Sequence, residues 1–158
     1  MTLTAERLRE FFHYDHETGV FTRKVGPKAG AVAIGGRRNG YLRLVVDGTR
    51  YSAHRLAWLY MTGSWPAAEV DHIDGVRGNN RWANLRQATR SQNQQNKRGW
   101  ASSGFKGCRW HRRDRKWTSS ITVEGHSIHL GNFDTVQEAR SAYASAARKH
   151  YGEFARPT

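Results

Sequence analysis

The stretch EVDHIDGVRGNNRWANLR, from Glu69 to Arg86, decides the fold prediction for this chain of 158 residues. It places Asp71 beside His72, continues into the turn pair Asp74-Gly75, and ends in an amide-rich segment. The pattern predicts a short strand around residues 70–73 and a second strand over 83–89, joined by a polar loop. Neighbouring strand residues point to opposite faces, so Asp71 and His72 can share one site only if the first strand ends or bends there, which Asp74-Gly75 permits.

The segment that follows, residues 90–99, is polar on every side. Such a segment forms a poor helix by itself because it is short and buries no apolar face. If it is helical, the surrounding fold or a bound ion must hold it.

The acid, the histidine and the amides suit phosphodiester hydrolysis. This reaction needs a base to generate hydroxide and a cation to neutralise charge on the phosphoryl group. His72 is a candidate base because imidazole titrates near neutrality. Asp71 is a hard oxygen ligand for Mg²⁺ or Mn²⁺. A second oxygen ligand must come from elsewhere, and Asn93 is the candidate, with Asn96 one turn further on as the alternative.

The ordered set resembles the HNH nucleases, in the variant found in phage and intron homing endonucleases. The residues that carry the resemblance are Asp71-His72-Ile73-Asp74-Gly75, Asn79-Asn80, Asn84-Leu85-Arg86 and Ser91-Gln92-Asn93. The resemblance implies a ββα-metal fold in which His72 is the general base and Asp71 and Asn93 ligate one divalent ion. It also implies that Asn84 ties the loop and that there is no structural zinc. His54 matches a family position too, although a packing role is favoured for it.

Positive charge points to a nucleic-acid partner. The chain carries 26 Lys and Arg against 13 Asp and Glu, and residues 75–116 hold 12 basic residues and one acid, Asp114. A concentrated positive field attracts polyanions. A solvated charged face is the alternative, but Trp82, Trp100, Phe105 and Trp110 supply apolar anchors in the same stretch, which favours a folded nucleic-acid surface. Arg86 and Arg90 are candidates for contact with the scissile phosphate or the backbone nearby, and Lys97 and Arg98 extend this basic set.

Cysteine content and hydropathy limit the class of protein. The single cysteine, Cys108, excludes an internal disulfide framework and a cysteine-based zinc cage. No signal peptide and no apolar run of about 20 residues is visible. We therefore expect a soluble protein in the cytoplasm, and the resemblance suggests a bacterial host and a phage or mobile-element origin.

The C-terminal third predicts three strands, over 104–110, 115–123 and 126–133, followed by a helix over 134–152. Thr135 and Glu138 form a capping-box pattern, and Gly152 ends the helix. This region resembles the plant ethylene-response-factor (Apetala-two) domain, through Gly107, Arg109, Lys116-Trp117, Ile121, Leu130-Gly131, Phe133-Asp134-Thr135, Glu138-Ala139 and Ala142-Tyr143.

Alternation along the middle strand turns Ile121 and Val123 toward the helix, so the other side is expected to face DNA. The candidate DNA-binding residues there are Lys106, Arg109, His111, Arg113, Lys116, Thr118, Ser120, Thr122 and His129. Several long base-reading side chains typical of that family are replaced by short ones, which predicts looser base reading with much of the affinity from phosphates.

The N-terminal part is expected to add a helix over 4–15, a strand over 18–24, an irregular glycine-rich stretch over 27–40, a hairpin (41–46 and 49–52, with Asp47-Gly48 as its turn) and a helix within residues 54–66. The apolar face of this last helix is expected to hold Leu56, Ala57, Tyr60 and Met61, and Gly63 is expected to end it. The fold class is therefore α+β: an HNH nuclease core with a hairpin and helix extension, plus a small antiparallel sheet packed on one helix. We expect a nuclease region at 1–98 (core about 51–98), a linker at 99–104 and a DNA-binding domain at 105–158.

The functional hypothesis is a metal-dependent endonuclease that cuts or nicks double-stranded DNA at preferred sites, like a homing endonuclease. A monomer is the simplest expectation, and a dimer would explain cutting of both strands. Two alternatives stay open. One is a DNA-binding regulator with an inactive nuclease half, and the other is an RNA-binding protein, since basic-aromatic surfaces also suit RNA.

Overall fold

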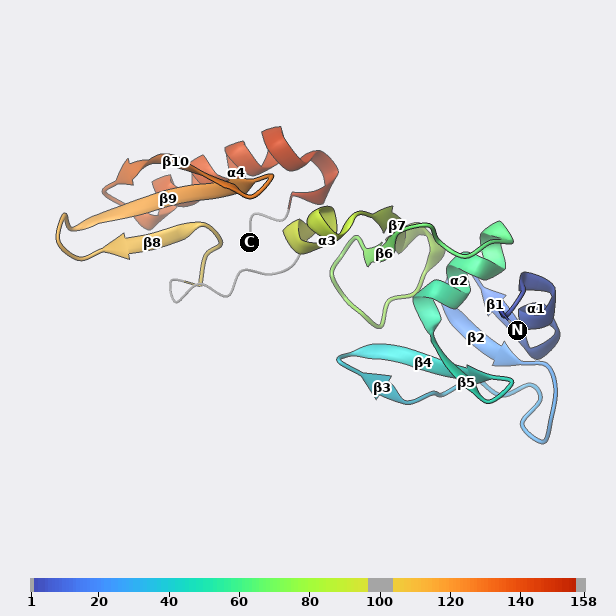
Figure 1. Cartoon of the computed structure of the whole chain (residues 1–158). Helices are drawn as coiled ribbons and strands as arrows, with labels where there is room; N and C mark the ends of the chain where they lie inside the picture. Colours follow the sequence, from blue (N-terminus) through green and yellow to red (C-terminus); the bar gives the residue numbers. More distant parts are fainter. Residues whose placement is uncertain (1, 97–103, 156–158) are drawn as a thin grey trace. The chain divides into compact units, whose positions relative to one another are not determined.

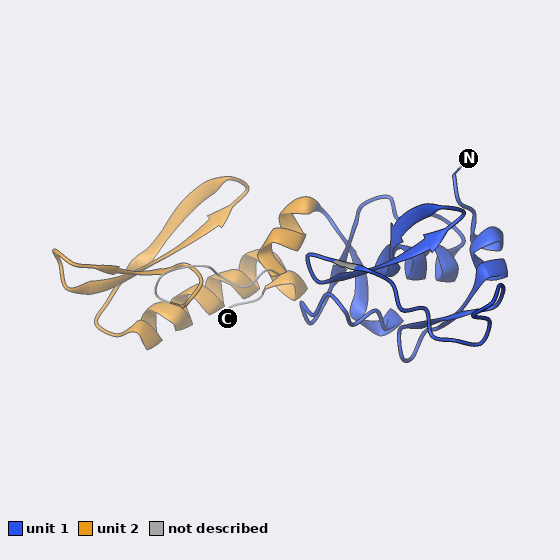
Figure 2. Ribbon diagram, turned by 90° about the horizontal axis from the view of Figure 1, so that it is seen from below, with its two compact units in different colours: residues 1–89 blue, residues 90–158 orange. Residues whose placement is uncertain are grey.

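The computed structural model describes residues 2–96 and 104–155 (Figure 1). The chain divides into two compact units, residues 1–89 and 90–158 (Figure 2), and each is described by itself. The division falls nine residues before the boundary expected at 98, so the helix that carries Asn93 groups with the second unit. Lys97, Arg98 and most of the expected linker lie outside the described residues.

The first unit begins with α1 (Ala5–Phe11), where the Thr4 hydroxyl accepts a hydrogen bond from the Arg7 amide at 3.2 Å. The expected continuation of this helix to Asp15 is wrong. Residues Phe12–Asp15 form β1, which pairs with β2 (Val20–Arg23). Phe12 and Tyr14 are buried while His13 between them is exposed. That two-residue period fits a strand, and burial of both rings outweighs local helix propensity.

A three-stranded sheet follows, in the order β3-β4-β5. The expected hairpin is confirmed as β4 (Tyr41–Val46) and β5 (Thr49–Ser52), and Asp47 and Gly48 have the positive φ values, 45° and 74°, that its two-residue turn requires. The stretch before it is less irregular than expected. Arg37–Arg38 form β3, joined to β4 by a second turn of the same kind at Asn39-Gly40.

Helix α2 (Ala53–Thr62) ends at Gly63, as predicted, in the left-handed conformation. It contacts α1, β4, β5 and β6. Its apolar face is displaced from the predicted one, because Leu59 is buried and Met61 is 39% exposed. The largest fully buried side chains of this unit are Leu8, Phe12, Phe21, Leu44, Leu56, Leu59 and Val46. At about 1.5–3 kcal/mol for each side chain this size, their burial is the main stabilising contribution that positions the site.

The quoted stretch folds as predicted into an antiparallel hairpin, β6 (Glu69–His72) and β7 (Leu85–Ala88). A single 3₁₀ turn, η1 (Trp82–Asn84), precedes β7. The polar segment is indeed helical, as α3 (Arg90–Asn96), and it belongs to the second unit, where it contacts η2 (Gly152–Phe154).

The rest of the second unit is a three-stranded antiparallel sheet covered on one face by α4 (Val136–Tyr151) (Figure 1). The strands are β8 (Cys108–His111), β9 (Lys116–Val123) and β10 (His126–Phe133), with β9 in the middle. Gly107 precedes β8 with φ +71°, and a Cβ there would lie 2.1 Å from the Tyr143 ring, so only glycine fits. The predicted capping box of Thr135 and Glu138 is present.

None of the helices in the described residues is long and apolar enough to cross a membrane.

Candidate active site

The β6–β7 pairing sets Asp71 opposite Arg86 and His72 opposite Leu85. The Asp71 carboxylate accepts hydrogen bonds through Oδ2 from Arg86 Nε at 3.1 Å and Nη2 at 3.0 Å. The two side chains are only 6% and 11% exposed. Removal of either partner would leave an uncompensated buried charge, so this ion pair fixes the position of the carboxylate.

His72 ends β6, and its imidazole is 3% exposed. Its Nε2 lies 3.2 Å from Oδ1 of Asn80. In the tautomer in which Nε2 carries the proton, the Asn80 oxygen accepts it and Nδ1 keeps the lone pair that a base requires. The ring also packs edge-on against His54, at 5.1 Å between centroids, and lies 5.9 Å from Tyr41.

Burial keeps both histidines neutral. It lowers the pKa of His72, opposed only in part by the hydrogen bond that Nε2 donates to Asn80 and by the charges of Asp74 and Asp71. Burial lowers the pKa of His54 to about 3, and the nearby His72 and Arg55 add to this effect. A neutral imidazole can accept a proton at neutral pH, so His72 has the protonation state of a general base.

A polar network closes the loop between the two strands. Asn84 accepts a hydrogen bond from the Asp74 amide at 3.0 Å, and its own amide donates to the Asp74 carboxylate at 3.0 Å and the Asn79 carbonyl at 2.8 Å. Asn79 donates to the second Asp74 oxygen at 2.7 Å. Burial would raise the pKa of Asp74, but hydrogen bonds from Val76, Asn79 and Asn84 outweigh it and the pKa is lowered. The network therefore holds an ionised carboxylate and fixes the loop after His72.

The loop is also supported by the β1–β2 hairpin. The Tyr14 hydroxyl donates to the Asn80 carbonyl at 2.6 Å, and the Trp82 amide donates to the His16 carbonyl at 2.9 Å. Gly19 allows this approach, because a Cβ there would lie 2.4 Å from the Asn80 backbone. The N-terminal hairpin thus positions the residue that holds His72.

Tyr41 covers the histidine pair from the start of β4. Its ring lies 5.0 Å from His54 and 5.9 Å from His72. The Arg77 guanidinium lies 5.1 Å from the centre of the Tyr41 ring and donates to the Asn39 carbonyl at 2.7 Å. The loop that follows His72 therefore holds the β3–β4 turn in place over the imidazole.

The remaining predicted catalytic-region residues lie on α3. Asn93 is half-buried, Asn96 is buried, and Arg90 is exposed. They belong to the second unit, whereas Asp71, His72, Asn84 and Arg86 belong to the first. Within the described ranges, no group of three or more His, Cys, Asp or Glu side chains is arranged to hold a metal. A metal ion bound at Asp71 would need further oxygen ligands, and carboxylate, amide and water oxygens are ligands that suit Mg²⁺ or Mn²⁺.

The predicted DNA side of the second unit has the expected alternation. Ser119 and Ile121 are buried on the helix side of β9, and Thr118, Ser120 and Thr122 alternate with them. The register sets Arg109 opposite Thr118 and His129 opposite Ser120, so these residues share one face.

Several members of this predicted set already have partners. Lys116 pairs with Asp134 at 2.5 Å, His111 lies 3.2 Å from Asp114, and Lys106 donates to the Gln95 carbonyl at 2.5 Å. Arg113 is exposed in the turn between β8 and β9.

Three residues at the site did not enter the predicted set. Asn80 belonged to the quoted motif, but an Asn-Asn pair is more typical of a loop than of a histidine partner. Arg77 lies in the same loop, and the sequence indicates only that it contributes to the positive charge of residues 75–116. Tyr41 lies 31 residues before His72, and no local signal in the sequence connects the two.

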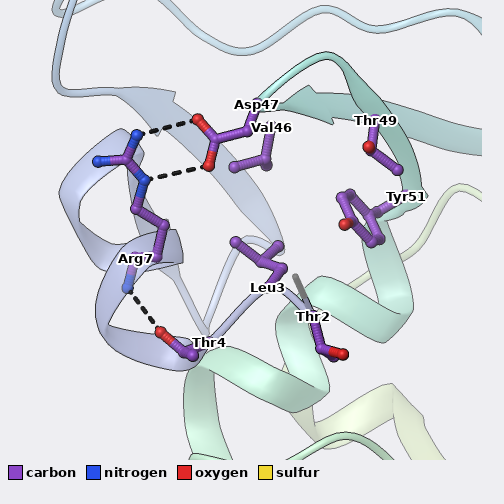
Figure 3. A pocket seen from close by; sticks show the side chains of 8 residues that line it. All are labelled: Thr2, Leu3, Thr4, Arg7, Val46, Asp47, Thr49 and Tyr51. Atoms are coloured by element: carbon purple, nitrogen blue, oxygen red, sulfur yellow. Dashed lines mark hydrogen bonds and ion pairs between the residues drawn. The ribbon is translucent and has the colours of Figure 1, made fainter.

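A separate hollow of about 560 Å³ lies at the N-terminus, between α1 and the β4–β5 turn (Figure 3). Among the described residues that line it, the charged side chains are Arg7 and Asp47, and these bind each other at 3.1 and 2.9 Å. Because this charge is already paired, we place no chemistry there.

Comparison with known proteins agrees with this geometry. A family model described as HNH endonuclease matches residues 51–95, which include α2, the β6–β7 hairpin and most of α3. The chain is 36% identical over 106 residues to an HNH endonuclease of Acanthamoeba polyphaga mimivirus, a match that covers 66% of this chain and 55% of that protein. The chain thus spans about half the length of the mimivirus protein.

The chain is also 31% identical over 106 residues to Protein 3.8 of Escherichia phage T7, which covers 65% of this chain and 87% of that protein. No solved structure matches the chain significantly. The predicted resemblance to the HNH nucleases is confirmed. The resemblance of the C-terminal region to the ethylene-response-factor domain stays a prediction.

Proposed function

The chain contains an HNH endonuclease domain at residues 51–95. From that premise we propose that it is a metal-dependent endonuclease that hydrolyses phosphodiester bonds in double-stranded DNA at preferred sites, in the manner of a homing endonuclease. The observation that carries the proposal is the end of β6, where a neutral, hydrogen-bonded His72 directly follows the buried carboxylate of Asp71.

His72 is the general base. Its lone pair takes a proton from a water molecule, and the resulting hydroxide attacks phosphorus. Asn80 holds the ring by its Nε2, and His54 packs against it edge-on. Asn84 is a positioning residue: it does not contact His72 in the hydrogen bonds given above, but it fixes the loop that follows His72 through its hydrogen bonds with Asp74 and Asn79.

Asp71 and Asn93, with Asn96 as the alternative to the latter, would hold one Mg²⁺ or Mn²⁺ ion, which supplies positive charge beside the phosphoryl oxygens and the leaving 3′ oxygen. The products are a 3′-hydroxyl and a 5′-phosphate. In the structure Arg86 neutralises Asp71 from the paired strand. With an ion held by Asp71, the Arg86 guanidinium would be free to bind a phosphate oxygen, and Arg90 on α3 is a second candidate for this contact.

Substrate access requires a movement, because His72 is 3% exposed. We expect the β3–β4 turn with Tyr41 to move off the imidazole when DNA binds. The turn is held by Arg77 through one hydrogen bond and one cation–π contact. The cation–π contact contributes about 0.5–2 kcal/mol, so opening is inexpensive compared with the energy of DNA binding.

The second unit positions the nuclease on DNA through the sheet face opposite α4. Arg109, Thr118, Ser120, Thr122 and His129 are the contacts that we propose, with Lys106, His111, Arg113, Lys116, Lys97 and Arg98 supplying phosphate contacts. Short side chains dominate the centre of this face, which favours loose base reading. One active site cuts one strand, so a monomer nicks, and a dimer would be needed to cut both. Its viral relatives favour a phage or mobile-element origin and action in the cytoplasm of a bacterial host.

The burial of His72 and the Asp71–Arg86 ion pair favour one alternative, a DNA-binding regulator whose nuclease half does not cut. One assay separates the two functions. Supercoiled plasmids carrying a random target library are incubated with the protein and Mg²⁺, with and without chelator, beside His72→Ala. Metal-dependent nicking that is lost in His72→Ala supports the endonuclease. Salt-sensitive duplex binding without nicking of any library member supports the regulator, and preference for RNA over DNA contradicts both.

A further inference from the structure

We propose that the outer face of the β3–β4–β5 sheet binds the phosphodiester backbone of DNA beside the cleavage site. We call this surface the arginine face and define it by Arg23, Arg38, Arg43 and Arg50, with Ile34 and Val45 between them. The inference rests on the proposed endonuclease function, because it takes DNA as the ligand. None of these residues belongs to the DNA-binding set expected from the sequence.

Strand alternation gathers Arg38, Arg43 and Arg50 on one side, and Arg23 of β2 joins them as a lining residue of the same cavity. Leu44 and Val46 of β4 are 1% exposed and point into the core, so Tyr41, Arg43 and Val45 point outward. The register sets Val45 opposite Arg50 on β5 and Arg38 opposite Tyr41 on β3. Residues directly opposite each other in an antiparallel pair share a face. The arginines of three strands therefore line the same surface.

The arginine face is hollowed. A cavity of about 500 Å³ is lined by all four arginines, Ile34, Val45 and the backbone of Gly35-Gly36, and none of its described lining residues is acidic. Arg43 is held in place, because its Nη2 donates to the Arg50 carbonyl at 3.1 Å. Its Nε is buried without a hydrogen-bond partner among the described residues. Such a site is electrostatically incomplete in the free protein, and a bound anion would compensate it.

The nearest acid along the chain does not neutralise this charge. Asp47 lies in the β4–β5 turn, and its carboxylate is bound by Arg7 of α1 through two hydrogen bonds (Figure 3). Four arginines line one hollow, so their positive charges repel each other, and a bound polyanion relieves that repulsion. The exposed side chains of Ile34, 85% exposed, and Val45, 45% exposed, offer apolar contact for the sugars between phosphates.

The arginine face continues into the active site. Tyr41 stands in the same outward row of β4 as Arg43 and Val45, and its ring contacts His54 and His72. Strand residues rise about 3.3 Å each, so Val45 lies about 13 Å from Tyr41. A DNA strand carries one phosphate per 3.4 Å of helix axis, so a duplex whose axis runs along β4 would meet the arginine face about four base pairs from the phosphate nearest His72.

Binding measured in the presence of chelator tests this inference without cleavage. The double variant Arg38→Gln/Arg50→Gln removes two exposed charges and leaves the partly buried Arg43 intact. The control Arg148→Gln/Lys149→Gln removes two charges from the last turn of α4, on the side of the second unit away from its expected DNA face. Fluorescence anisotropy with a labelled duplex gives the dissociation constant at several salt concentrations. Thermal midpoints establish that both variants are folded. If the arginine-face double variant is unfolded, the single variants Arg38→Gln and Arg50→Gln are measured in its place.

The arginine-face variant is expected to bind DNA about tenfold more weakly, the effect of losing about 1.4 kcal/mol of phosphate contact. The slope of log affinity against log salt should fall by about two, since each phosphate contact contributes about 0.9. The α4 control should retain the wild-type slope. Equal losses in the two variants, or stronger binding of an RNA duplex than of DNA by the wild type, would overturn the inference.

The position of the arginine face is tested with Val45→Cys carrying a tethered iron chelate. Cys108 is 2% exposed, so the label goes to the introduced thiol. Radical cuts are expected within about one helical turn, 10 base pairs, of the enzyme's own nick and on one side of it. Cuts at random positions would contradict placement beside the active site. If the protein nicks DNA but its binding does not depend on Arg38 and Arg50, the proposed function stands and the arginine face is wrong. If binding depends on these arginines but no nicking occurs, the arginine face stands and the proposed function is wrong.

Discussion

Asn80 is the residue whose contribution to the site is most specific, since its amide oxygen is bound to Nε2 of His72 at 3.2 Å and its carbonyl to Tyr14 at 2.6 Å. We predict that Asn80→Ala lowers the cleavage rate at saturating DNA about 10–100-fold, because a misplaced base loses near-attack geometry. DNA affinity should not change.

The pH–rate profile separates this positioning role from a general loss of structure. The Asn80 contact raises the pKa of His72, so its removal should move the acidic limb of the profile to lower pH. Gln87→Ala, an exposed position on β7, is the matched control. A wild-type rate and profile for Asn80→Ala would show that Asn80 does not position the base.

His54 predicts how stability depends on pH. Its pKa is about 3 in the folded chain, against an ordinary value of about 6.5 in the unfolded chain. Between these values the unfolded chain binds the extra proton, so the free energy of unfolding falls as pH falls from about 6.5 toward 3. The full contribution of His54 to the free energy of unfolding is roughly 5 kcal/mol.

Urea denaturation in the presence of chelator measures this effect. His54→Phe removes the titrating group, so its stability should fall less between pH 7 and pH 4 than that of the wild type. The control is His126→Gln, which changes an exposed histidine. If His54→Phe and the wild type lose the same stability over this range, the low pKa of His54 is not a property of the folded chain.

At the scale of elements, the β3–β4 hairpin is predicted to control access to His72. Arg77→Ala removes both the hydrogen bond to Asn39 and the contact with the Tyr41 ring. The turn should then open more often, and carbethoxylation of His72, followed by peptide mass spectrometry, should become faster. Arg81→Ala changes an exposed arginine in the same loop and is the control. Equal modification rates in both variants and the wild type would contradict a covering role for this hairpin.

Element prediction succeeded where the signal was local. Asp47-Gly48 gave the β4–β5 turn, Gly63 ended α2, and Thr135 with Glu138 started α4, because each depends on residues within one or two turns. It failed at Phe12–Asp15, where pairing with β2 and burial of two rings outweighed helix propensity. It also missed the pairing of Arg37–Arg38 with β4, although Asn39-Gly40 carried the turn signal.

For the site, the sequence could predict only which residues near His72 along the chain would lie together. Asp71, Asn84 and Arg86 lie within one hairpin, so their grouping follows from spacing. The cover by Tyr41 and Arg77 depends on how an earlier hairpin packs against this one, which spacing does not specify. The partnership of Arg86 with Asp71 follows from the strand register, which places them directly opposite each other.

At the scale of the whole molecule, binding and cutting are predicted to be separable. Arg109 is exposed on the sheet face opposite α4, far along the chain from His72. Arg109→Gln should weaken DNA binding and lower the salt slope by about one, while the cleavage rate at saturating DNA stays unchanged. Comparison of the half-saturating DNA concentration with the maximal rate measures this. A fall in the maximal rate alone would mean that the second unit takes part in the chemistry.

The central claim is the proposed metal site, in which Asp71 and an asparagine of α3 would serve as ligands of one divalent ion. Calorimetric titration with Mn²⁺ tests it directly and needs no knowledge of the target sequence. We predict one ion per chain, binding at least about tenfold weaker in Asp71→Asn and in Asn93→Ala, and a double variant no weaker than the worse single one, because both residues serve the same site. Wild-type Mn²⁺ affinity in Asn93→Ala and in Asn96→Ala would contradict the claim.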